Sequence, residues 1–330
     1  DMSTTNWMSN MSYKRWLRQI VMTGSHDDGV YGTAKTELRN NRFVKNSYVV
    51  CQNSDFSKQA LAGSRFFDCR VFQQKVAPGQ YEQKLGHFAM ERKKSSTPAM
   101  GGYGGALEAV LRSAFEFVLG HPSEFVILRF SHTYHPDACV QEIYQIIQGD
   151  QRFGQATYKE TGNIATKPIS SLRGKVIMVF DEKFNKKITP TAGVHRFKKF
   201  ETGLEQIDGL ATCGKFSRSM SMSKVHDGAI DAMNKHINTH QGQPGHLHFV
   251  YWQQTAGLFG EKDIYKTTTA APNANAAYSG GASQHIGDFA AEIKNNIKGA
   301  TMPVNVISHD FVTSETCLPI IRLNPECAGI

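Results

Sequence analysis

Titratable side chains gather at or near the ends of several short apolar segments of this 330-residue chain. Some are histidines, which change protonation state near neutral pH, one is an arginine, and the others are carboxylates. A neutral imidazole can remove a proton from an attacking hydroxyl, a protonated imidazole can give one to a leaving oxygen, and an arginine can hold phosphate oxygens. These residue types therefore predict phosphoryl transfer. The set consists of His26, Asp27, Asp28, Asp68, Arg70, His87, His132, Asp181 and Asp310.

The segments that carry these groups are apolar or β-branched runs, and they alternate with helical patterns. Eight such runs favour a closed parallel barrel over an open sheet. Active-site residues of barrels lie at the carboxyl ends of the strands, where the titratable groups occur here. We expect an α/β fold, an irregular TIM-like (β/α)8 barrel, in a single domain covering residues 1–330. The expected strands are Ile20–Ser25, Arg65–Phe72, Gln83–Met90, Phe125–Ser131, Lys175–Asp181, Gly209–Lys215, His248–Gln254 and Val304–His309.

The helices expected between these strands show apolar residues at helical spacing, most clearly in Ala106–Leu119. No helix is expected between the second and third strands, so the barrel should be irregular there. The expected helices are Tyr13–Leu17, Phe56–Ala62, Ala106–Leu119, Ala138–Ile147, Ser223–His240 and Gly287–Ile297.

Three other segments are expected to be loops or solvated faces. The glycines of Gly101–Gly105 precede a helix, but their spacing matches neither a P-loop nor a dinucleotide-binding fingerprint. We therefore expect Lys94–Gly105 to be a loop. Thr267–Ser283 is rich in small polar residues and is the best candidate for a flexible loop. The basic run Arg196–Lys199 predicts a solvated loop or helix face.

Composition and charge limit the class of protein. With 40% apolar and 20% charged residues, the chain can fill a sizeable core and is not a disordered tail. No apolar run is long enough for a membrane-spanning helix. The formal net charge of +8 favours an anionic partner, such as an anionic membrane face or a phosphorylated molecule. We expect no nucleic-acid partner, because the sequence has no basic tail and no base-stacking motif.

The six cysteines lack zinc-finger spacing and are too few for a disulfide scaffold. Cys317 and Cys327 could form one disulfide if the chain is exported. His246 and His248 would share one face of a strand and could bind a metal, although such pairs more often face solvent or make hydrogen bonds. The dipeptide Leu258-Phe259 between two glycines is typical of an exposed loop tip, where insertion into a membrane interface is credible.

Several motifs, in order along most of the chain, resemble the X-domain of the phosphatidylinositol-specific phospholipases C, in particular the bacterial single-domain enzymes. The resemblance implies an irregular TIM-like barrel, in agreement with the strand count. The matching segments are Asn6-Trp7-Met8, Gly24-Ser25-His26-Asp27, Gly63-Ser64-Arg65-Phe66-Phe67-Asp68-Cys69-Arg70, Gly86-His87, Pro122–Leu128 and Asn305–Val312.

The resemblance also implies a role for each matching residue. His26 would be the general base that deprotonates the inositol 2-hydroxyl, with Asp310 orienting it. His87 would be the general acid on the diacylglycerol oxygen, with Asp27 as its partner. The remaining two roles fall to Arg70, which would hold the phosphate, and Asp68, which would help to position the site. The products would be diacylglycerol and a cyclic inositol phosphate.

Arg70 also bears on the metal requirement. Calcium-dependent relatives have a carboxylate where this chain has Arg70, and a guanidinium there would repel calcium. We therefore expect no cofactor and a metal-independent reaction, with calcium as the alternative.

The chain departs from the family pattern around the headgroup. Asp28 would add a negative charge near the phosphate, and His132 and Asp181 stand where bacterial relatives have a lysine and an arginine. The residues expected to line the substrate site are His132, Tyr134, Asp181, Trp252 and Gln254.

These departures leave alternatives open. One is a phosphodiesterase acting on another phospholipid or on a glycosylated phosphoinositide, and another is a non-catalytic lipid-binding barrel. The expected partners are a phospholipid membrane surface and an inositol phospholipid substrate. We expect a monomer of bacterial type that is secreted and acts peripherally on membranes, with a cytoplasmic location as the alternative.

Overall fold

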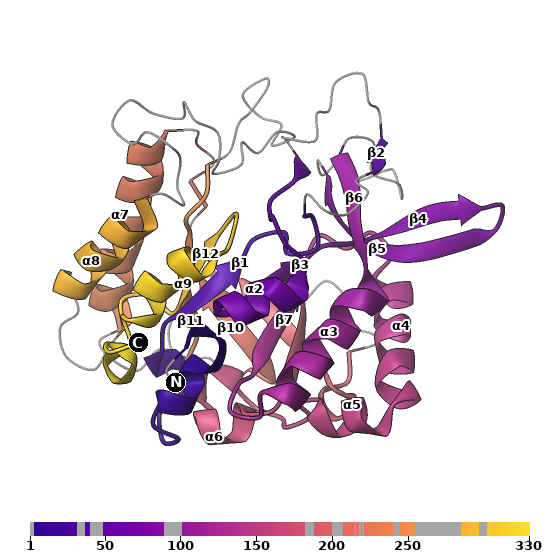
Figure 1. The fold of residues 1–330 in the computed structure, drawn as a ribbon, viewed down its shortest axis with the longest axis horizontal. Coiled ribbons are helices and arrows are strands. Elements are labelled where there is room, and N and C mark those ends of the chain that lie inside the picture. Colours follow the sequence, from indigo (N-terminus) through magenta and orange to yellow (C-terminus); the bar gives the residue numbers. More distant parts are fainter. Residues whose placement is uncertain are drawn as a thin grey trace.

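The computed structural model describes residues 3–31, 37–39, 49–88, 101–181, 188–199, 207–214, 216–217, 219, 221–240, 245–254, 285–296 and 302–330. Within them, eight parallel strands close into a barrel in the order β1-β12-β11-β10-β9-β8-β7-β3 (Figure 1). This confirms the predicted TIM-like fold class. The barrel strands are β1 (Met22–Ser25), β3 (Ser64–Cys69), β7 (Val126–Phe130), β8 (Val176–Asp181), β9 (Val194–Lys199), β10 (Gly209–Cys213), β11 (Leu247–Tyr251) and β12 (Val306–His309).

Helices cover the outside of the barrel, with α7 and α8 on one side and α3, α4 and α5 on the other (Figure 1). The α-helices are α2 (Phe56–Ala62), α3 (Leu107–Gly120), α4 (Pro136–Gly149), α5 (Gln151–Ala156), α6 (Ile169–Leu172), α7 (Met222–His240), α8 (Ile286–Asn296) and α9 (Ser314–Ile321). Short 3-10 helices are Thr4–Asn10, Leu17–Gln19, Ile164–Thr166, Pro190–Ala192 and Pro325–Cys327. No helix in this described part of the chain is both long and apolar enough to cross a membrane.

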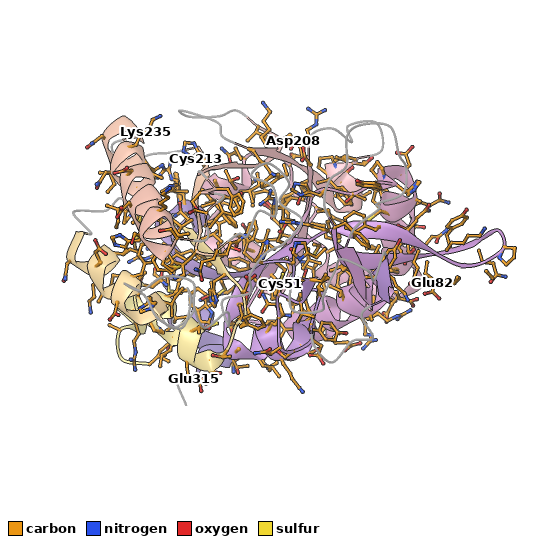
Figure 2. The ribbon with its side chains drawn as sticks, turned by 90° about the horizontal axis from the view of Figure 1, so that it is seen from above. Cys51, Glu82, Asp208, Cys213, Lys235 and Glu315 are labelled. Carbon is orange, nitrogen blue, oxygen red and sulfur yellow. The ribbon has the colours of Figure 1, made fainter. Side chains whose placement is uncertain are left out.

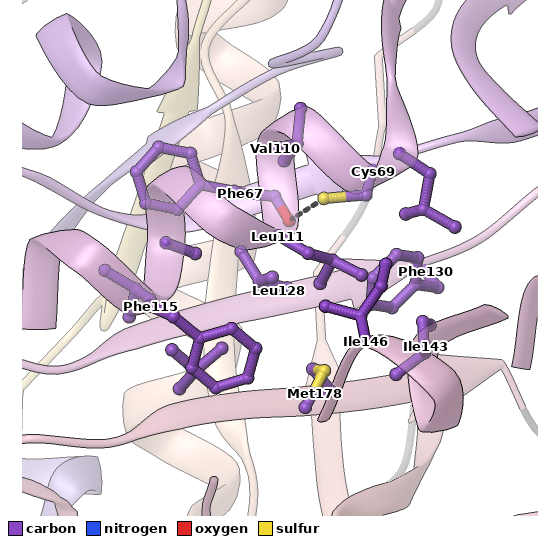
Figure 3. Packing of buried hydrophobic residues seen from close by; sticks show 14 of the residues in the cluster. Phe67, Cys69, Val110, Leu111, Phe115, Leu128, Phe130, Ile143, Ile146 and Met178 are labelled. Carbon is purple, nitrogen blue, oxygen red and sulfur yellow. Dashed lines mark hydrogen bonds between the residues drawn. The ribbon is translucent and has the colours of Figure 1, made fainter. Parts of the chain in front are cut away.

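The alternation of side chains along each strand separates two apolar layers. Phe66 of β3, Ile127 of β7 and Phe249 of β11 belong to the cluster that fills the barrel. Their neighbours in sequence point outward and pack under helices. Figure 3 shows one such outer cluster, in which Phe67 and Leu128 pack with side chains of α3 and α4. Any other residue of these strands points inward if it is an even number of positions from one of these three residues, and outward if the number is odd.

A second sheet stands beside the barrel and extends away from it as a hairpin (Figure 1). Its antiparallel order is β2-β6-β5-β4, with β2 (Glu37–Arg39), β6 (Gly101–Ala106), β5 (Gln80–Phe88) and β4 (Val71–Ala77). We call these four strands the side sheet. Arg70 is the single residue between β3 of the barrel and β4 of the side sheet. The chain therefore passes directly from one sheet into the other at Arg70.

One strand predicted from sequence lies in a different sheet from the one expected, and one barrel strand was not predicted. Gln83–Met90 was expected in the barrel, but β5 pairs with β4 and β6 in the side sheet. The missing barrel strand is β9, in which Arg196–Lys199 was expected to be a solvated face. The basic residues of β9 obscured its strand pattern, because inward-facing His195 and Phe197 alternate with Arg196 and Lys198.

The glycine run also differs from its prediction as a loop, since Gly101–Ala106 is strand β6. A Cβ on Gly101 would lie 2.1 Å from the carbonyl oxygen of His87, and one on Gly104 would lie 2.0 Å from that of Gly29. The glycines thus allow two backbones to approach the strand more closely than a side chain permits. They place β5, which carries His87, against the barrel.

The expected helix Tyr13–Leu17 is instead a turn followed by the 3-10 helix Leu17–Gln19, because Trp16 forms a bridge with Pro168 in place of helical bonds. The other expected helices are present within a few residues. Cys317 and Cys327 are separate buried thiols, so the disulfide considered from the sequence is not formed in this structure. The expected loop Thr267–Ser283 and the dipeptide Leu258-Phe259 lie outside the described residues.

Candidate active site

His26 directly follows β1 and is held in a fixed orientation. Its Nδ1 is 2.6 Å from Oδ1 of Asp310, and its Nε2 is 3.2 Å from Nη2 of Arg70. Because a carboxylate accepts and a guanidinium donates, Nδ1 carries the proton and Nε2 carries the lone pair. The amide of Gln52 donates to the main-chain carbonyls of His26 and His309, at 2.8 and 3.3 Å, and so ties the ends of β1 and β12 together. His26 therefore presents a basic Nε2.

The Arg70 guanidinium joins three groups of the site. Its Nε is 2.7 Å from Oδ1 of Asp27, and its Nη2 is 3.0 Å from Oδ2 of Asp68. Burial alone would lower the pKa of Arg70, but the two carboxylates raise it above its ordinary value. Its side chain is still 14% exposed. Arg70 is thus a permanent cation that can be reached by an anion.

Asp68 lies at the inward-facing end of β3. Ser131 donates to its Oδ1 at 3.1 Å, while its Oδ2 contacts Arg70. Burial would raise the pKa of Asp68, but the positive charges of Arg70 and Arg129 outweigh it and hold the pKa below its usual range. Asp68 is therefore ionised and fixes the arginine from the barrel side.

His87 reaches the site from the side sheet. Its ring centroid is 6.3 Å from that of His26, and the two rings are nearly perpendicular, at 79°. Its Nδ1 is 2.9 Å from the carbonyl oxygen of Val49, 3.4 Å from Sγ of Cys51 and 3.7 Å from Oδ2 of Asp27. Since a carbonyl only accepts, Nδ1 is protonated. The partner predicted for His87, Asp27, is a longer contact than the Val49 carbonyl.

Asp27 lies between the two histidines, and its neighbour Asp28 differs from expectation. Oδ2 of Asp27 is 3.3 Å from Nε2 of His26, and the same oxygen is 3.7 Å from Nδ1 of His87. Asp28 is completely buried, and burial raises its pKa well above its ordinary value despite a hydrogen bond with the thiol of Cys69. The raised pKa favours the neutral form of Asp28, whereas a negative charge was expected there from the sequence.

Backbone strain is concentrated at the same edge of the barrel. Among the described residues, Asp27, His132 and Phe311 are the non-glycine residues with positive φ, at 44°, 56° and 52°. They follow β1, β7 and β12, respectively. Strained conformations of this kind persist where the surrounding structure holds them, and they cluster at functional sites.

Three of the predicted substrate-lining residues lie near these groups. The half-buried His132 is 3.0 Å from the hydroxyl of Ser131, and burial together with the charges of Arg70 and Lys199 lowers its pKa well below the ordinary value. Asp181 is the last residue of β8. Tyr134 packs on Phe72 of the side sheet, with ring centroids 5.3 Å apart. Their contacts with a substrate stay predictions.

Trp252, which was also expected to line the site, lies elsewhere. It points outward from the barrel and stacks on Phe289 of α8 at 3.9 Å, with 1% of its surface exposed. Its position in the alternation explains this, because Phe249 and Tyr251 take the inward places on this strand. Gln254 is fully buried beyond β11, and its role stays a prediction.

Two inward-facing cations were missed from the sequence. Arg129 of β7 is buried inside the barrel, with its guanidinium over the ring of Phe197 at 4.5 Å. Lys199, the last residue of β9, faces the same interior, and burial together with the charge of Arg129 lowers its pKa to about 7. Once β9 is recognised as a strand, its alternation with Phe197 places Lys199 at the barrel mouth.

Among the described residues, three groups of ligand-type side chains in the site are each close enough to share a metal ion, and two of them include the thiol of Cys51. The third, with two carboxylates, is His26 with Asp27 and Asp68. Calcium takes about six to eight oxygen ligands. Here both carboxylates already contact Arg70, whose charge repels a cation. The donor set therefore does not suit calcium.

Comparisons with known proteins agree with the motifs. No protein-family model matches the chain. A 1-phosphatidylinositol phosphodiesterase of Staphylococcus aureus strain Newman is 24% identical over 179 residues, which cover 53% of this chain and 50% of that protein. A protein of the same name from strain NCTC 8325 gives the same identity over 48% of its length. The match thus spans about half the length of these curated relatives.

Solved structures extend the likeness in fold to nearly the whole chain. The phosphatidylinositol-specific phospholipase C of Listeria monocytogenes has a TM-score of 0.61 and 14% identity, covering 98% of this chain and 99% of that one. A variant of the Staphylococcus aureus enzyme has a TM-score of 0.62 and 16% identity, covering 98% of both chains. The chain therefore has the fold of the bacterial phosphatidylinositol-specific phospholipases C and resembles them in sequence over about half its length.

Proposed function

We propose that this protein is a phosphodiesterase that cleaves phosphatidylinositol into diacylglycerol and a cyclic inositol phosphate. The observation that carries the proposal is the placement of two imidazoles, His26 and His87, with ring centroids 6.3 Å apart beside the guanidinium of Arg70. Both rings can reach oxygens of one phosphate group bound to that cation. The names of the relatives and the shared fold support the same reaction class.

The first step uses His26 as general base. Its Nε2 removes the proton of the inositol 2-hydroxyl, and that oxygen then forms a bond to phosphorus. The imidazolium that results is stabilised by Asp310, whose carboxylate is 2.6 Å from Nδ1. Asp310 thus both orients the ring and favours its charged form.

The bond from phosphorus to the glycerol oxygen breaks as the new bond forms. His87, protonated on both nitrogens, gives the proton of Nε2 to the departing oxygen and so yields diacylglycerol. Val49 and Asp27 hold the other nitrogen of His87. Hydrolysis of the cyclic phosphate would use the two histidines in exchanged roles.

Arg70 stabilises the charge that builds up on the non-bridging phosphate oxygens. It is positioned by Asp27 and Asp68, so little reorganisation is needed when the substrate binds. Because this cation is part of the chain, we propose that the reaction needs no metal ion.

The headgroup is held at the barrel mouth in this proposal. Three consecutive strands of the barrel, β9, β8 and β7, carry Lys199, Asp181 and His132 at or just after their carboxyl ends. Hydroxyls or phosphates of an inositol ring would lie there. A lysine with a pKa of about 7 gains charge when an anion binds beside it. This cation favours an inositol phospholipid with a further phosphate on its headgroup as the second candidate substrate.

We also propose that the protein is a single-domain monomer that is secreted and acts at membrane surfaces. The net charge of +8 supports attraction to anionic lipid.

A lipid panel tests the function. Vesicles containing phosphatidylinositol, phosphatidylcholine, a lysophospholipid or a glycosylated phosphoinositide would be incubated with the protein, and the products followed by phosphorus NMR. We expect cleavage of phosphatidylinositol with a cyclic phosphate product. Equal cleavage of phosphatidylcholine would refute the headgroup assignment, and vesicle binding without cleavage of any lipid would favour a non-catalytic barrel.

A further inference from the structure

A second cluster of titratable side chains lies outside the barrel, between its strands and helix α7. Cys213 ends β10, and His246 and His248 stand at the start of β11. Leu210, Leu247 and Phe249 take the inward places on these two strands. Cys213, His246 and His248 therefore point outward, toward the covering helix.

Helix α7 contributes a histidine to the same layer. Its buried residues Met222, Val225, Ala229, Met233 and His236 recur every three or four positions and form one inward stripe. The first four belong to an apolar cluster, and His236 ends the stripe with only 3% of its surface exposed. An imidazole at this place replaces the apolar side chain that the pattern calls for.

The ligand atoms of this cluster converge. Nδ1 of His236 is 3.5 Å from Sγ of Cys213. The ligand atoms of Cys213, His236 and His246 all lie within 4.8 Å of one another. A tetrahedral zinc ion, with bonds of about 2.3 Å to sulfur and 2.0–2.1 Å to nitrogen, holds its ligand atoms about 3.5 Å apart. The Cys213–His236 pair has this spacing, and a ligand nitrogen of His246 lies within 4.8 Å of both atoms.

His248 fixes the orientation of one ligand. Its ring stacks on that of His236 at 4.5 Å with an angle of 20°, and its own Nδ1 is bonded to the carbonyl of Pro303. The backbone of His248 is also tied, because its amide donates to Asn305. These contacts hold the His236 ring in place beside Cys213.

We propose that Cys213, His236 and His246 form a zinc site on the outer wall of the barrel, with the fourth position taken by water or an added ligand. One thiolate and two imidazoles are the ligand set that zinc prefers, and calcium or magnesium would need oxygen ligands instead. The site joins α7 to β10 and β11. Its role is to hold the second half of that helix on the barrel.

The site is separate from the catalytic groups. In Figure 2, Cys51 lies near the middle of the molecule, whereas Cys213 lies apart from it beside the helix that carries Lys235. The proposal therefore does not depend on the proposed function. The competing interpretation is a thiol–imidazole hydrogen bond between Cys213 and His236 without any metal, which the distance of 3.5 Å also allows.

The test measures metal content and cobalt spectra of the intact chain. Protein purified without chelator would be analysed for zinc, then stripped and titrated with Co²⁺. We expect one tightly held zinc ion per chain, cobalt absorption bands of a tetrahedral site with a sulfur ligand, and a rise in Tm of about 2 °C or more when zinc is restored.

Variants distinguish a metal bound at Cys213 from a metal bound near Cys51 in the catalytic region. Cys213→Ser and His236→Gln should each weaken zinc binding by about 100-fold or more, and Cys213→Ser should in addition remove the sulfur-to-cobalt band. Cys51→Ser tests the catalytic region, and His226→Gln removes another histidine of α7, one that pairs with Glu292 of α8 instead. Both of these controls should keep the zinc.

Each other outcome overturns the proposal. If stripped wild-type protein binds zinc no more tightly than Cys213→Ser does, the cluster is a hydrogen-bonded pair only. If Cys51→Ser loses the ion while Cys213→Ser keeps it, the metal belongs to the catalytic region. Cobalt bands without sulfur character would exclude Cys213 as a ligand.

Discussion

At the scale of single residues, the site is organised around Arg70. Its guanidinium contacts Asp27, Asp68 and His26, each within 3.2 Å, so the proposed phosphate-binding group also sets the position of the proposed base. His87, the proposed acid, differs, because its shortest contact is with the main-chain carbonyl of Val49. His26 is thus held by charged side chains, whereas His87 is held by the backbone around it.

Substitution of His26 and substitution of His87 are predicted to differ in their effect on an activated substrate. His26→Ala and His87→Ala should each lower kcat on phosphatidylinositol by about 100- to 10,000-fold, as expected for loss of a general base or acid. A substrate analogue with a nitrophenol leaving group needs no acid, so it should restore turnover in His87→Ala but not in His26→Ala. Rates would be compared with those of His121→Ala, a histidine at the end of α3. Rescue of both variants, or of neither, would contradict the assigned roles.

Lys199 gives a prediction for stability against pH. Its pKa is about 7 in the folded chain and ordinarily 10.5, so the unfolded chain binds the extra proton between these values. The free energy of unfolding should therefore gain a contribution as pH rises from about 7 to 10.5, and this contribution is absent below pH 7. Lys199→Met should remove it, so the urea midpoints of variant and wild type should approach each other across that range.

The exposed lysine of α7, Lys224, supplies the control for this measurement. Lys224→Met should follow the wild type at every pH. A constant difference between wild type and Lys199→Met from pH 7 to 10.5 would mean that Lys199 keeps an ordinary pKa in the folded chain.

Most of the groups that converge at the candidate site could be picked out from sequence, because short motifs mark the strand ends that carry them. His26, Arg70 and Asp310 converge as those motifs predict. Trp252 could not be placed, since residue type alone does not say which face of a strand a side chain occupies. Lys199 was missed because the basic run Arg196–Lys199 was expected to be a solvated face, and Arg129 was given no role although it lies within the expected strand Phe125–Ser131.

At the scale of elements, the side sheet positions His87, the proposed acid. β5 presents His87, and β6 packs against it through glycines that leave room for the backbone. The strand β5 was predicted from sequence but was placed in the barrel instead of the side sheet, because strand pairing depends on contacts between residues far apart in the chain. β9 was missed because its alternation is carried partly by histidine and lysine rather than by apolar residues.

Substitution of Gly101 tests whether the close packing of β6 positions His87. Gly101→Ala would place a Cβ 2.1 Å from the carbonyl of His87 at a φ of 146°, so it should cost more than about 2 kcal/mol of stability and lower kcat sharply. Gly79→Ala, at the hairpin tip with φ of 74° and nothing within 4 Å, should cost about 1 kcal/mol and leave kcat unchanged. Thermal unfolding and initial rates below Tm measure both effects. Equal loss of activity in the two variants would show that β6 does not position His87.

At the scale of the whole molecule, the arrangement of charge supports the proposal that the reaction needs no added cation. Carboxylates that could attract calcium are occupied by Arg70, and further positive charge stands nearby on Lys199 and Arg129. The only metal proposed here is on the outer wall, remote from the reacting groups.

Chelation therefore has a two-part prediction. EDTA should leave the rate of phosphatidylinositol cleavage at 25 °C unchanged, and added calcium should not raise it, because Arg70 supplies the positive charge. Assays on vesicles before and after dialysis against EDTA measure this. Complete loss of activity that calcium alone restores would show that a metal, and not Arg70, neutralises the phosphate.

The direct passage of the chain from β3 through Arg70 into β4 has a consequence for how the proposed reaction could diversify. In that proposal the proton acceptor belongs to the barrel and the proton donor to the side sheet, and the two sheets are joined through Arg70, the proposed anion-binding residue. Insertions in the projecting hairpin could tilt the side sheet and admit bulkier departing alcohols. Selectivity for the leaving alcohol could thus drift while the attacking side of the reaction keeps its geometry.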